Sequence, residues 1–256
     1  MNNLQPHLKV KKGDISSYIL LPGDPQRVYI IGKRLKNFKI MRKNREFTIG
    51  IGKYKKTSVT ICSTGIGSPS AAIAVEELAR VGAQVFIRIG TCGALKKEIE
   101  PGNLIIPSRA LRQEGTTKEY VNDNYEAWSD KEILEALKNS ANRLNFRYFV
   151  GVNRTHDAFY EPTDNFLRLM DLPEYKKGEL VSSEMECSAI FTVARLRGLK
   201  AGAVLAVNTS EPLEEISKNP NLVYQLEVSP RAAKGVNDAI QVALMAIEFL
   251  NKKDKI

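Results

Sequence analysis

Residues 85–93 have the sequence Val-Phe-Ile-Arg-Ile-Gly-Thr-Cys-Gly, and this stretch decides the fold. It begins with β-branched and aromatic residues and ends in glycines, a pattern typical of a buried strand followed by a turn. Five similar runs alternate with helical patterns along the chain. They lie at residues 18–21, 58–62, 104–106, 148–152 and 203–207. The alternation predicts an α/β fold with a largely buried sheet.

Helical patterns fill several of the intervals between these runs. One helix is expected to start at Ser68, with the Ser68 side chain as its cap and Pro69 at the first helical position. A second begins near residues 129–130. A third has apolar residues at helical spacing from 236 to 250, followed by a charged tail, residues 251–256, that we expect to fray.

The chain shows no internal boundary. No repeat or low-complexity linker divides it, so we predict a single domain over residues 1–256. Two stretches, 112–128 and 211–228, have weak periodicity and are rich in Thr, Asn, Pro and charge. We expect functional loops or lids there.

Composition and charge narrow the class of protein. The chain has 256 residues, with 38 Lys and Arg against 29 Asp and Glu, and a formal net charge of +9. A hydrophobic fraction of 43% with 26% charged residues is typical of a soluble globular protein and excludes a disordered or collagen-like chain. No apolar stretch approaches the ~20 residues that span a bilayer, and the N-terminus lacks the apolar core of a signal peptide. We therefore expect a cytoplasmic protein with no membrane partner.

The sequence gives little support to metal or disulfide chemistry. Its three cysteines, Cys62, Cys92 and Cys187, are odd in number and have no CxxC spacing. His7 and His156 are the only histidines that could add imidazole ligands. We therefore predict neither a disulfide framework nor a bound metal.

Glycine and arginine follow several of the predicted strands. Gly23 and Arg27 come after the first run, a glycine-rich segment at 62–69 follows the second, and Arg88 leads into Gly90, Thr91 and Gly93. Ligands of open α/β sheets lie beyond the carboxyl ends of strands, and backbone N–H groups, a hydroxyl and guanidinium groups suit an oxyanion such as phosphate.

Each of these signals has a simpler explanation. A glycine alone more often marks a turn than a phosphate site. Arg88 follows a buried run, where an unpaired charge is costly, so it needs an anionic partner. A carboxylate of the protein would serve that purpose as well as a bound ligand.

Two carboxylates, Glu184 and Glu186, stand just before an apolar helical pattern. An exposed acidic first turn, favoured by the helix dipole, is one interpretation. The apolar residues on both sides indicate burial instead. A buried glutamate near a sugar could accept hydrogen bonds from vicinal hydroxyl groups.

Taken together, these segments closely resemble the hexameric nucleoside phosphorylases of the uridine phosphorylase and bacterial-type purine nucleoside phosphorylase group. The matching segments lie at residues 22–27, 44–47, 63–70, 76–78, 88–93, 157–160 and 183–186. The resemblance extends from about His7 to the last helix, in order and at compatible spacing. It implies one α/β domain with a central mixed sheet between helices, in three layers, and a homo-oligomer, a hexamer built from dimers with shared active sites.

The resemblance also implies a reaction and a set of site residues. A nucleoside and phosphate would give a free base and a pentose 1-phosphate, with phosphate as co-substrate and no cofactor. Phosphate would be held by Gly23, Arg27, Arg88, Thr91 and the neighbouring subunit's copy of Arg45. The nucleoside would be bound by Met185, Glu186, Phe159, Cys92, Gly93, Glu184, Thr209 and the neighbouring subunit's copy of His7. Arg88 and Glu186 are the expected catalytic residues.

These roles agree with the chemistry of the reaction. Breaking the N-glycosidic bond builds positive charge on the sugar, and phosphate held beneath C1′ both stabilises that charge and attacks it. Glu186 would fix the ring through its hydroxyl groups. The departing base must then be stabilised by a proton or by hydrogen bonds.

For the base, the sequence departs from the patterns of both subfamilies. Purine enzymes of the group place an aspartate after the strand at 203–207, and this chain has Asn208, Thr209 and Ser210 there. Uridine phosphorylases use a Gln and an Arg shortly after the Phe-Tyr pair, where this chain has Glu161 and, further on, Arg168. The segment 112–120 resembles that of uridine phosphorylases. We therefore expect a uridine phosphorylase, with a purine nucleoside or methylthioadenosine phosphorylase as the alternative.

Three other classes compete with this interpretation. A nucleoside hydrolase of the same fold uses water and needs no phosphate site. The presence of Arg27, Arg45 and Arg88 together therefore argues against a hydrolase. A nucleic-acid-binding protein would fit the charge, but aromatic residues are only 7% and no binding module is visible, so we expect no nucleic acid partner. A regulatory nucleoside-binding protein is disfavoured by the complete phosphate set.

Overall fold

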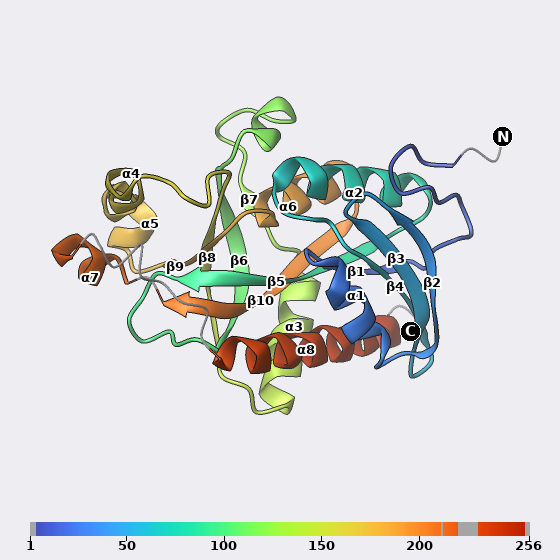
Figure 1. Cartoon of the computed structure of the whole chain (residues 1–256). Helices are drawn as coiled ribbons and strands as arrows, with labels where there is room; N and C mark the ends of the chain where they lie inside the picture. The colour runs from blue at the N-terminus through green and yellow to red at the C-terminus, as the bar shows by residue number, and fades with distance from the viewer. Residues whose placement is uncertain (1–3, 211, 220–229, 254–256) are drawn as a thin grey trace.

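The computed structural model describes residues 4–210, 212–219 and 230–253 (Figure 1). Ten strands in these ranges form one mixed sheet in the order β10-β6-β8-β9-β5-β1-β4-β3-β2, with β7 beside β6. The strands are β1 Tyr18–Pro22, β2 Lys36–Asn44, β3 Phe47–Tyr54, β4 Thr57–Cys62, β5 Val85–Ala94, β6 Leu104–Gln113, β7 Ala127–Trp128, β8 Tyr148–His156, β9 Leu180–Glu184 and β10 Lys200–Ser210. The predicted α/β fold with a central mixed sheet is confirmed.

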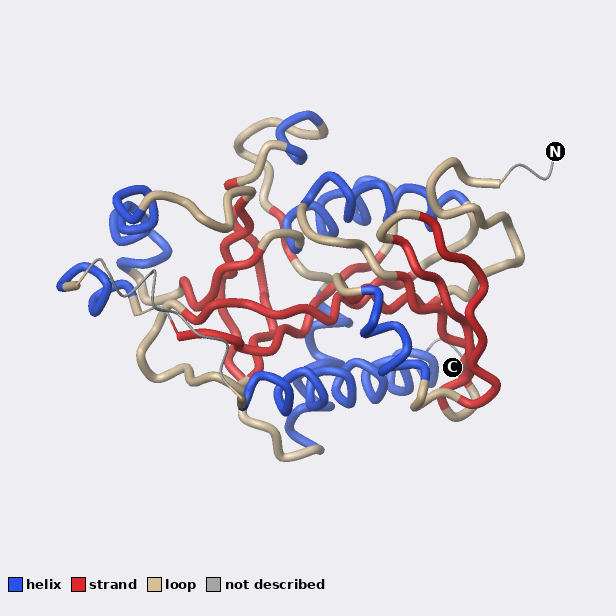
Figure 2. The backbone as a smooth tube through the Cα atoms, viewed as in Figure 1, coloured by secondary structure: helices blue, strands red, loops and turns tan. Residues whose placement is uncertain are grey.

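Helices cover both faces of this sheet (Figure 2). They are α1 Pro25–Gly32, α2 Ser68–Arg80, η1 Thr116–Glu119, α3 Lys131–Arg143, α4 Thr163–Leu167, η2 Arg168–Asp171, α5 Pro173–Lys176, α6 Cys187–Leu196, α7 Leu213–Lys218 and α8 Arg231–Lys253. One apolar core lies under α2 and α6, and a second lies under α1, α3 and α8. A third, smaller core joins α4, η2 and α7 to the far end of the sheet.

The central strand β5 has different neighbours along its length. On one edge it pairs with β10 throughout. On the other edge β1 pairs with its first half, ending opposite Ile89, and β9 joins only at Gly93. Between Ile89 and Gly93, β5 therefore has no paired strand on this edge, and a gap opens between β1 and β9. A crevice where neighbouring strands diverge is the usual ligand site of such sheets.

All six predicted runs are strands, namely β1, β4, β5, β6, β8 and β10. The helices expected from residue 68, from residues 129–130 and over 236–250 are α2, α3 and α8. Asp130 caps α3 by accepting hydrogen bonds from the backbone N–H groups of Glu132 and Ile133, at 2.9 and 3.2 Å. No strand was predicted at β2, β3, β7 or β9.

The predicted cap of α2 is wrong. The capping position is Gly67, with φ of 99°, and Ser68 is the first helical residue. The Ser68 hydroxyl instead donates to the carbonyl oxygen of Met185, at 2.9 Å. The Ser68 side chain, predicted to cap its own helix, therefore forms a tertiary hydrogen bond instead.

The expected loops and tail are only partly described. Residues 112–128 contain the end of β6, the short helix η1 and β7. Much of 211–228 and of the tail at 251–256 lies outside the described residues, although α7 and the end of α8 fall within these stretches. No helix in the described ranges is long and apolar enough to cross a membrane.

Candidate active site

Arg88 lies on β5 opposite Leu21 of β1, just before the gap between β1 and β9. Its side chain is buried, and Nε donates to Glu184 Oε2 at 3.1 Å while Nη2 contacts the carboxylate of Glu186. Burial alone would lower the pKa of Arg88, but Glu186 and Glu184 raise it overall, so the guanidinium stays charged. Nη1 is buried and has no hydrogen-bond partner among the described residues. The protein carboxylates therefore satisfy only part of this arginine.

A second arginine approaches the same place. Arg27 lies in the first turn of α1, which Asp24 caps by accepting the backbone N–H of Gln26 at 2.8 Å. The Arg27 Nη1 donates to the carbonyl oxygen of Ile89 at 3.2 Å. Burial and the charge of Arg88 both lower the pKa of Arg27. Two neighbouring guanidinium groups, one of which has a nitrogen without a partner among the described residues, favour an anion.

Glycines allow this close packing. A Cβ at Gly90 would lie 2.8 Å from Arg88 Cζ and 2.8 Å from Leu205 Cδ2, so a side chain there would displace the guanidinium or the core. A Cβ at Gly23 would lie 3.1 Å from the carbonyl oxygen of Gly65. These glycines therefore have a packing reason in addition to any contact with an anion.

Glu184 is saturated by protein donors. It accepts hydrogen bonds from Asn153 Nδ2 at 2.8 Å and Thr155 Oγ1 at 2.7 Å, and from the backbone N–H groups of Glu186 and Cys187. Burial would raise its pKa, but Arg88 and these hydrogen bonds lower it overall. Glu184 therefore holds Arg88 in place, and it faces Arg88 rather than an open pocket.

Glu186 has a different environment from Glu184. Its Oε1 accepts the backbone N–H of Gly67 at 2.7 Å, and its Oε2 contacts Arg88. Burial raises the pKa of Glu186 although Arg88 opposes the shift. This carboxylate therefore gains from any further hydrogen-bond donor that reaches it.

The start of α2 fixes this glutamate. Gly65 and Gly67 have positive φ values of 70° and 99°, a backbone conformation that favours glycine. The turn presents the Gly67 N–H to Glu186 and the Ser68 hydroxyl to Met185. The segments that the sequence analysis quoted at 63–70 and 183–186 are thus hydrogen-bonded to each other.

The structure brings most of the predicted residues to one region. Thr91, Cys92 and Gly93 continue β5 beyond Arg88, and Thr209 of β10 pairs in register with Gly93. Phe159 follows β8 and is 71% exposed.

His7 and Arg45 are not brought to this region within the chain. The backbone N–H of His7 donates to Glu77 Oε1 at 3.0 Å, and its Nδ1 lies 2.7 Å from the same oxygen. Arg45 is exposed in the turn between β2 and β3, with φ of 52°. Their predicted entry into a neighbouring subunit's site stays a prediction.

Several residues that build the site were not among the predicted site residues. They are Gly67, Gly90, Asn153 and Thr155. Asn153 and Thr155 belong to a strand far from Glu184 in the chain, and only the pairing of β8 with β9 brings them together. The glycines carried a signal, since both stood in segments quoted for an anion site.

Comparison with known proteins agrees with this geometry. A family model described as the Phosphorylase superfamily matches residues 17–247. A guanosine phosphorylase of Halorubrum lacusprofundi is 38% identical over 247 residues, which cover 96% of this chain and 99% of that protein. A uridine phosphorylase of Thermococcus kodakarensis is 40% identical over 224 residues, covering 84% of this chain and 80% of that protein.

Solved structures show the same relationship. A uridine phosphorylase of Vibrio fischeri superposes with a TM-score of 0.83 at 35% identity, covering 96% of this chain and 97% of that one. A purine nucleoside phosphorylase of Toxoplasma gondii has a TM-score of 0.86 at 24% identity, covering 99% and 98%, and shares the fold. The chain belongs to the nucleoside phosphorylase family of the phosphorylase superfamily.

Proposed function

We propose that this protein catalyses the reversible phosphorolysis of a nucleoside, with uridine preferred, to free base and ribose 1-phosphate in nucleoside salvage or catabolism. The observation that carries the proposal is the buried Nη1 of Arg88, which has no partner among the described residues and lies near Arg27. A phosphate dianion supplies the acceptor that both guanidinium groups need.

Phosphate binding follows from this arrangement. Arg27 and Arg88 hold phosphate oxygens, with Gly23 and Thr91 as further donors. Because two Arg88 nitrogens are already bonded to carboxylates, the guanidinium attracts phosphate without fully neutralising its nucleophilic oxygen. That oxygen attacks C1′ as the glycosidic bond breaks, and its charge stabilises the cationic sugar.

Glu186 connects the phosphate to the sugar. The ribose hydroxyl groups donate to this carboxylate, and Met185 and Phe159 pack against the nucleoside. Since burial raises the pKa of Glu186, hydrogen bonds from the sugar stabilise its ionised form. The same carboxylate contacts Arg88. The binding of the sugar and the binding of phosphate are therefore coupled through the ion pair of Glu186 and Arg88.

The relatives favour uridine but leave a second candidate. Uridine phosphorylases of T. kodakarensis and V. fischeri are 40% and 35% identical to this chain. A guanosine phosphorylase at 38% identity supports a purine nucleoside as the alternative substrate. A methylthioadenosine phosphorylase has no specific observation in its favour.

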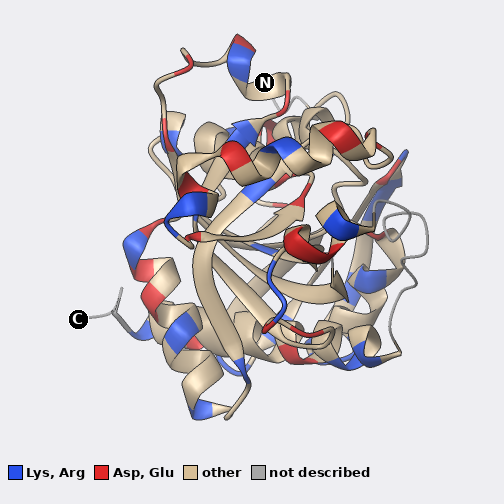
Figure 3. Ribbon diagram, turned by 90° about the vertical axis from the view of Figure 1, so that its left-hand side faces the viewer, with Lys and Arg blue, Asp and Glu red and all other residues tan. Residues whose placement is uncertain are grey.

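The basic charge does not require a nucleic acid partner. On the face seen in Figure 3, Lys and Arg are interspersed with Asp and Glu rather than gathered in one basic surface. A hydrolase has no use for the Arg27 and Arg88 pair. We also propose that the protein is cytoplasmic and forms a hexamer of dimers, in which Arg45 and His7 enter the neighbouring site.

Phosphate dependence tests the reaction. Wild-type protein is expected to release uracil from uridine only when phosphate is present, with ribose 1-phosphate as co-product. Arg27→Ala removes a charged hydrogen-bond donor and should raise the KM for phosphate about 10- to 100-fold. Arg109→Ala is the matched control, because Arg109 forms ion pairs with Glu126 and Glu174 away from this site.

Two results would contradict the proposal. Base release at full rate without phosphate would indicate a hydrolase. An unchanged phosphate KM in both Arg27→Ala and Arg88→Ala would show that phosphate binds elsewhere.

A further inference from the structure

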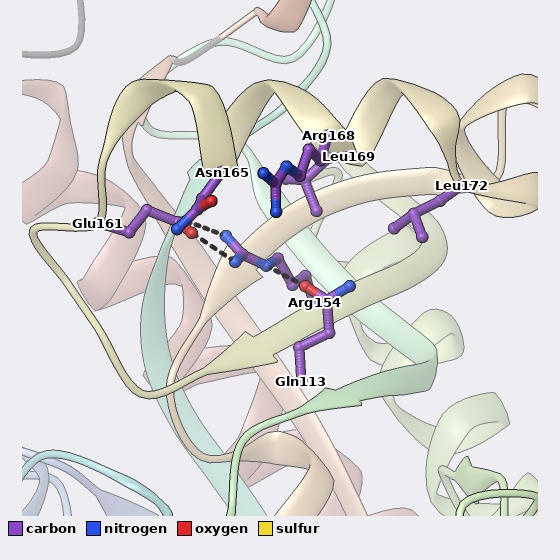
Figure 4. Close-up of a pocket in the computed structure, with 7 residues that line it drawn as sticks. All are labelled: Gln113, Arg154, Glu161, Asn165, Arg168, Leu169 and Leu172. Atoms are coloured by element: carbon purple, nitrogen blue, oxygen red, sulfur yellow. Dashed lines mark hydrogen bonds and ion pairs between the residues drawn. The ribbon is translucent and has the colours of Figure 1, made fainter.

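A cavity of about 300 Å³ lies between β8 and the helices α4 and η2 (Figure 4). Its lining residues are Gln113, Arg154, Glu161, Asn165, Arg168, Leu169 and Leu172. Arg154 is only 5% exposed. Its Nε donates to Gln113 Oε1 at 2.7 Å, Nη2 donates to Glu161 Oε2 at 2.9 Å, and Nη1 contacts the other Glu161 oxygen.

Arg154 is held firmly yet keeps donors for a ligand. A guanidinium has five N–H groups, and these contacts use three of them. Figure 4 shows the guanidinium of Arg168 on the helix side of the same space, toward Arg154. The cavity therefore has two guanidinium groups against the single carboxylate of Glu161, and it favours negative charge.

Strand register connects this cavity to the nucleoside region. Arg154 of β8 pairs with Ser183 of β9, Ser183 pairs with Gly93 of β5, and Gly93 pairs with Thr209 of β10. Residues paired in register on neighbouring strands project from the same face, and the strands are about 4.8 Å apart. Gly93 and Arg154 are thus about 10 Å apart across one row.

Ser183 is the polar group between them. The residue is 7% exposed, and its Oγ is buried with no hydrogen-bond partner among the described residues. Its neighbour Ser182 projects from the opposite face and donates to Asn153 Oδ1 at 2.8 Å. Gly93 adds no side chain to the row. The row therefore consists of a glycine, a buried hydroxyl with no partner among the described residues, and the arginine of the cavity.

We propose that the base of the substrate lies over Gly93 with its far edge toward Ser183, and that Arg154 stabilises the negative charge of the departing base. The inference rests on the proposed phosphorolysis. As the C1′–N bond breaks, its electron pair moves into the base and onto a ring carbonyl oxygen, where Arg154 and Arg168 receive the charge. Phosphate oxygen forms the new bond to C1′, and solvent later supplies the proton of the free base.

This placement defines the class of substrate. Uracil and 6-oxopurines delocalise the leaving charge onto a carbonyl oxygen, whereas adenine must be protonated on its ring. The end of β10, at Asn208, Thr209 and Ser210, provides no carboxylic acid for that protonation. Nucleosides of oxo bases should therefore react faster than adenosine.

The test compares two leaving groups in one variant. Arg154→Ala should lower kcat/KM for uridine about 10²- to 10³-fold, as loss of a charge-stabilising donor does in other enzymes. The loss should be at least about tenfold smaller for 5-fluorouridine, whose base is a better leaving group, and the phosphate KM should stay within about twofold. Ser183→Ala should lower kcat/KM for uridine about tenfold.

Controls separate this role from folding. The ratio of the two substrates is independent of the folded fraction, and Arg154→Lys keeps the charge beside Glu161 and should recover part of the activity. Arg109→Ala should leave the ratio unchanged. Equal losses for both substrates, or a loss confined to phosphate KM, would overturn the role of Arg154.

Failure of the proposed function itself would look different. In that case the wild-type protein releases no base with phosphate from either substrate. Calorimetric binding of free uracil then decides the placement of the base independently of turnover. Weakening about tenfold or more by Arg154→Ala and Ser183→Ala supports it, and equal binding by wild type and both variants contradicts it.

Discussion

Gly90 determines whether the buried arginine of β5 can adopt its observed position. The guanidinium of Arg88 passes over the place where a Cβ would be, 2.8 Å away, and Leu205 fills the space on the same side. Both carboxylates that hold Arg88 are buried, so the arginine cannot simply swing aside. The guanidinium of Arg88 can therefore occupy this position only because residue 90 has no side chain.

Gly90→Ala should damage phosphate binding and stability together. Overpacking in a closed core costs about 1–3 kcal/mol in the free energy of unfolding, and displacement of Arg88 should raise the phosphate KM at least about tenfold. Urea unfolding and phosphate saturation curves measure the two effects. Gly115→Ala is the control, because a Cβ there meets no atom closer than 3.7 Å. A variant with normal phosphate KM would show that Arg88 tolerates displacement.

Individual site residues differed in how well the sequence predicted them. Arg88 could be found because a charge inside an apolar run needs an anionic partner. The structure shows two carboxylate partners and one nitrogen, Nη1, with no partner among the described residues. Glu184 was expected along the base pocket, yet its oxygens are occupied by donors from β8 and α6. The β8 donors, Asn153 and Thr155, are distant from Glu184 in the chain, so no local pattern indicates them.

The start of helix α2 is hydrogen-bonded to the segment that carries Met185 and Glu186. Its first turn is anchored to the segment after β9 by the Ser68 hydroxyl and the Gly67 N–H. A shift of this helix end would move Glu186 relative to Arg88. The helix terminus therefore positions the carboxylate expected to hold the sugar.

Ser68→Ala should loosen that connection. Loss of one buried hydrogen bond lowers the free energy of unfolding by about 1 kcal/mol, and the KM for uridine should rise several-fold while the phosphate KM changes little. Ser140→Ala is the control: this serine is also buried, but its hydroxyl only donates back to Ala136 of its own helix, at 2.7 Å. Equal effects of both variants on the KM for uridine would mean that Ser68 contributes stability alone.

Elements with a strong apolar pattern were predictable and the others were not. β2 is largely exposed and rich in lysine and arginine, so it offers no apolar run. β9 is buried but ends in Ser182, Ser183 and Glu184, two of which form hydrogen bonds with Asn153 and Arg88 instead of packing in an apolar core. The local sequence of such a strand resembles that of a loop. Its extended conformation depends on pairing with β5 and β8.

The assembly of subunits can be tested by co-expressing two variants that are each nearly inactive. Arg45→Ala removes the residue assigned to the neighbouring site, whereas Glu186→Gln disables a residue of the chain's own site. If sites are shared in dimers, a mixed pair contains one site with neither defect. Random co-expression in equal amounts should then restore about a quarter of wild-type activity, although each variant alone is nearly inactive.

Activity equal to the mean of the separate variants would show that sites are not shared. Sedimentation of the active species adds an independent check. A fully active monomer would refute the assembly proposed for Arg45 and His7.

The position of β5 also has a consequence for biosynthesis. Its edges are filled by β1, which precedes it, and by β10, with Val85 paired to Lys200. A ribosome releases the chain from the N-terminus, so the apolar edge of β5 stays open until residues beyond 200 have emerged. Such long-range pairing slows folding and exposes an edge to association with other chains. The strand that carries Arg88 is thus among the last parts of the sheet to be protected in a newly made chain.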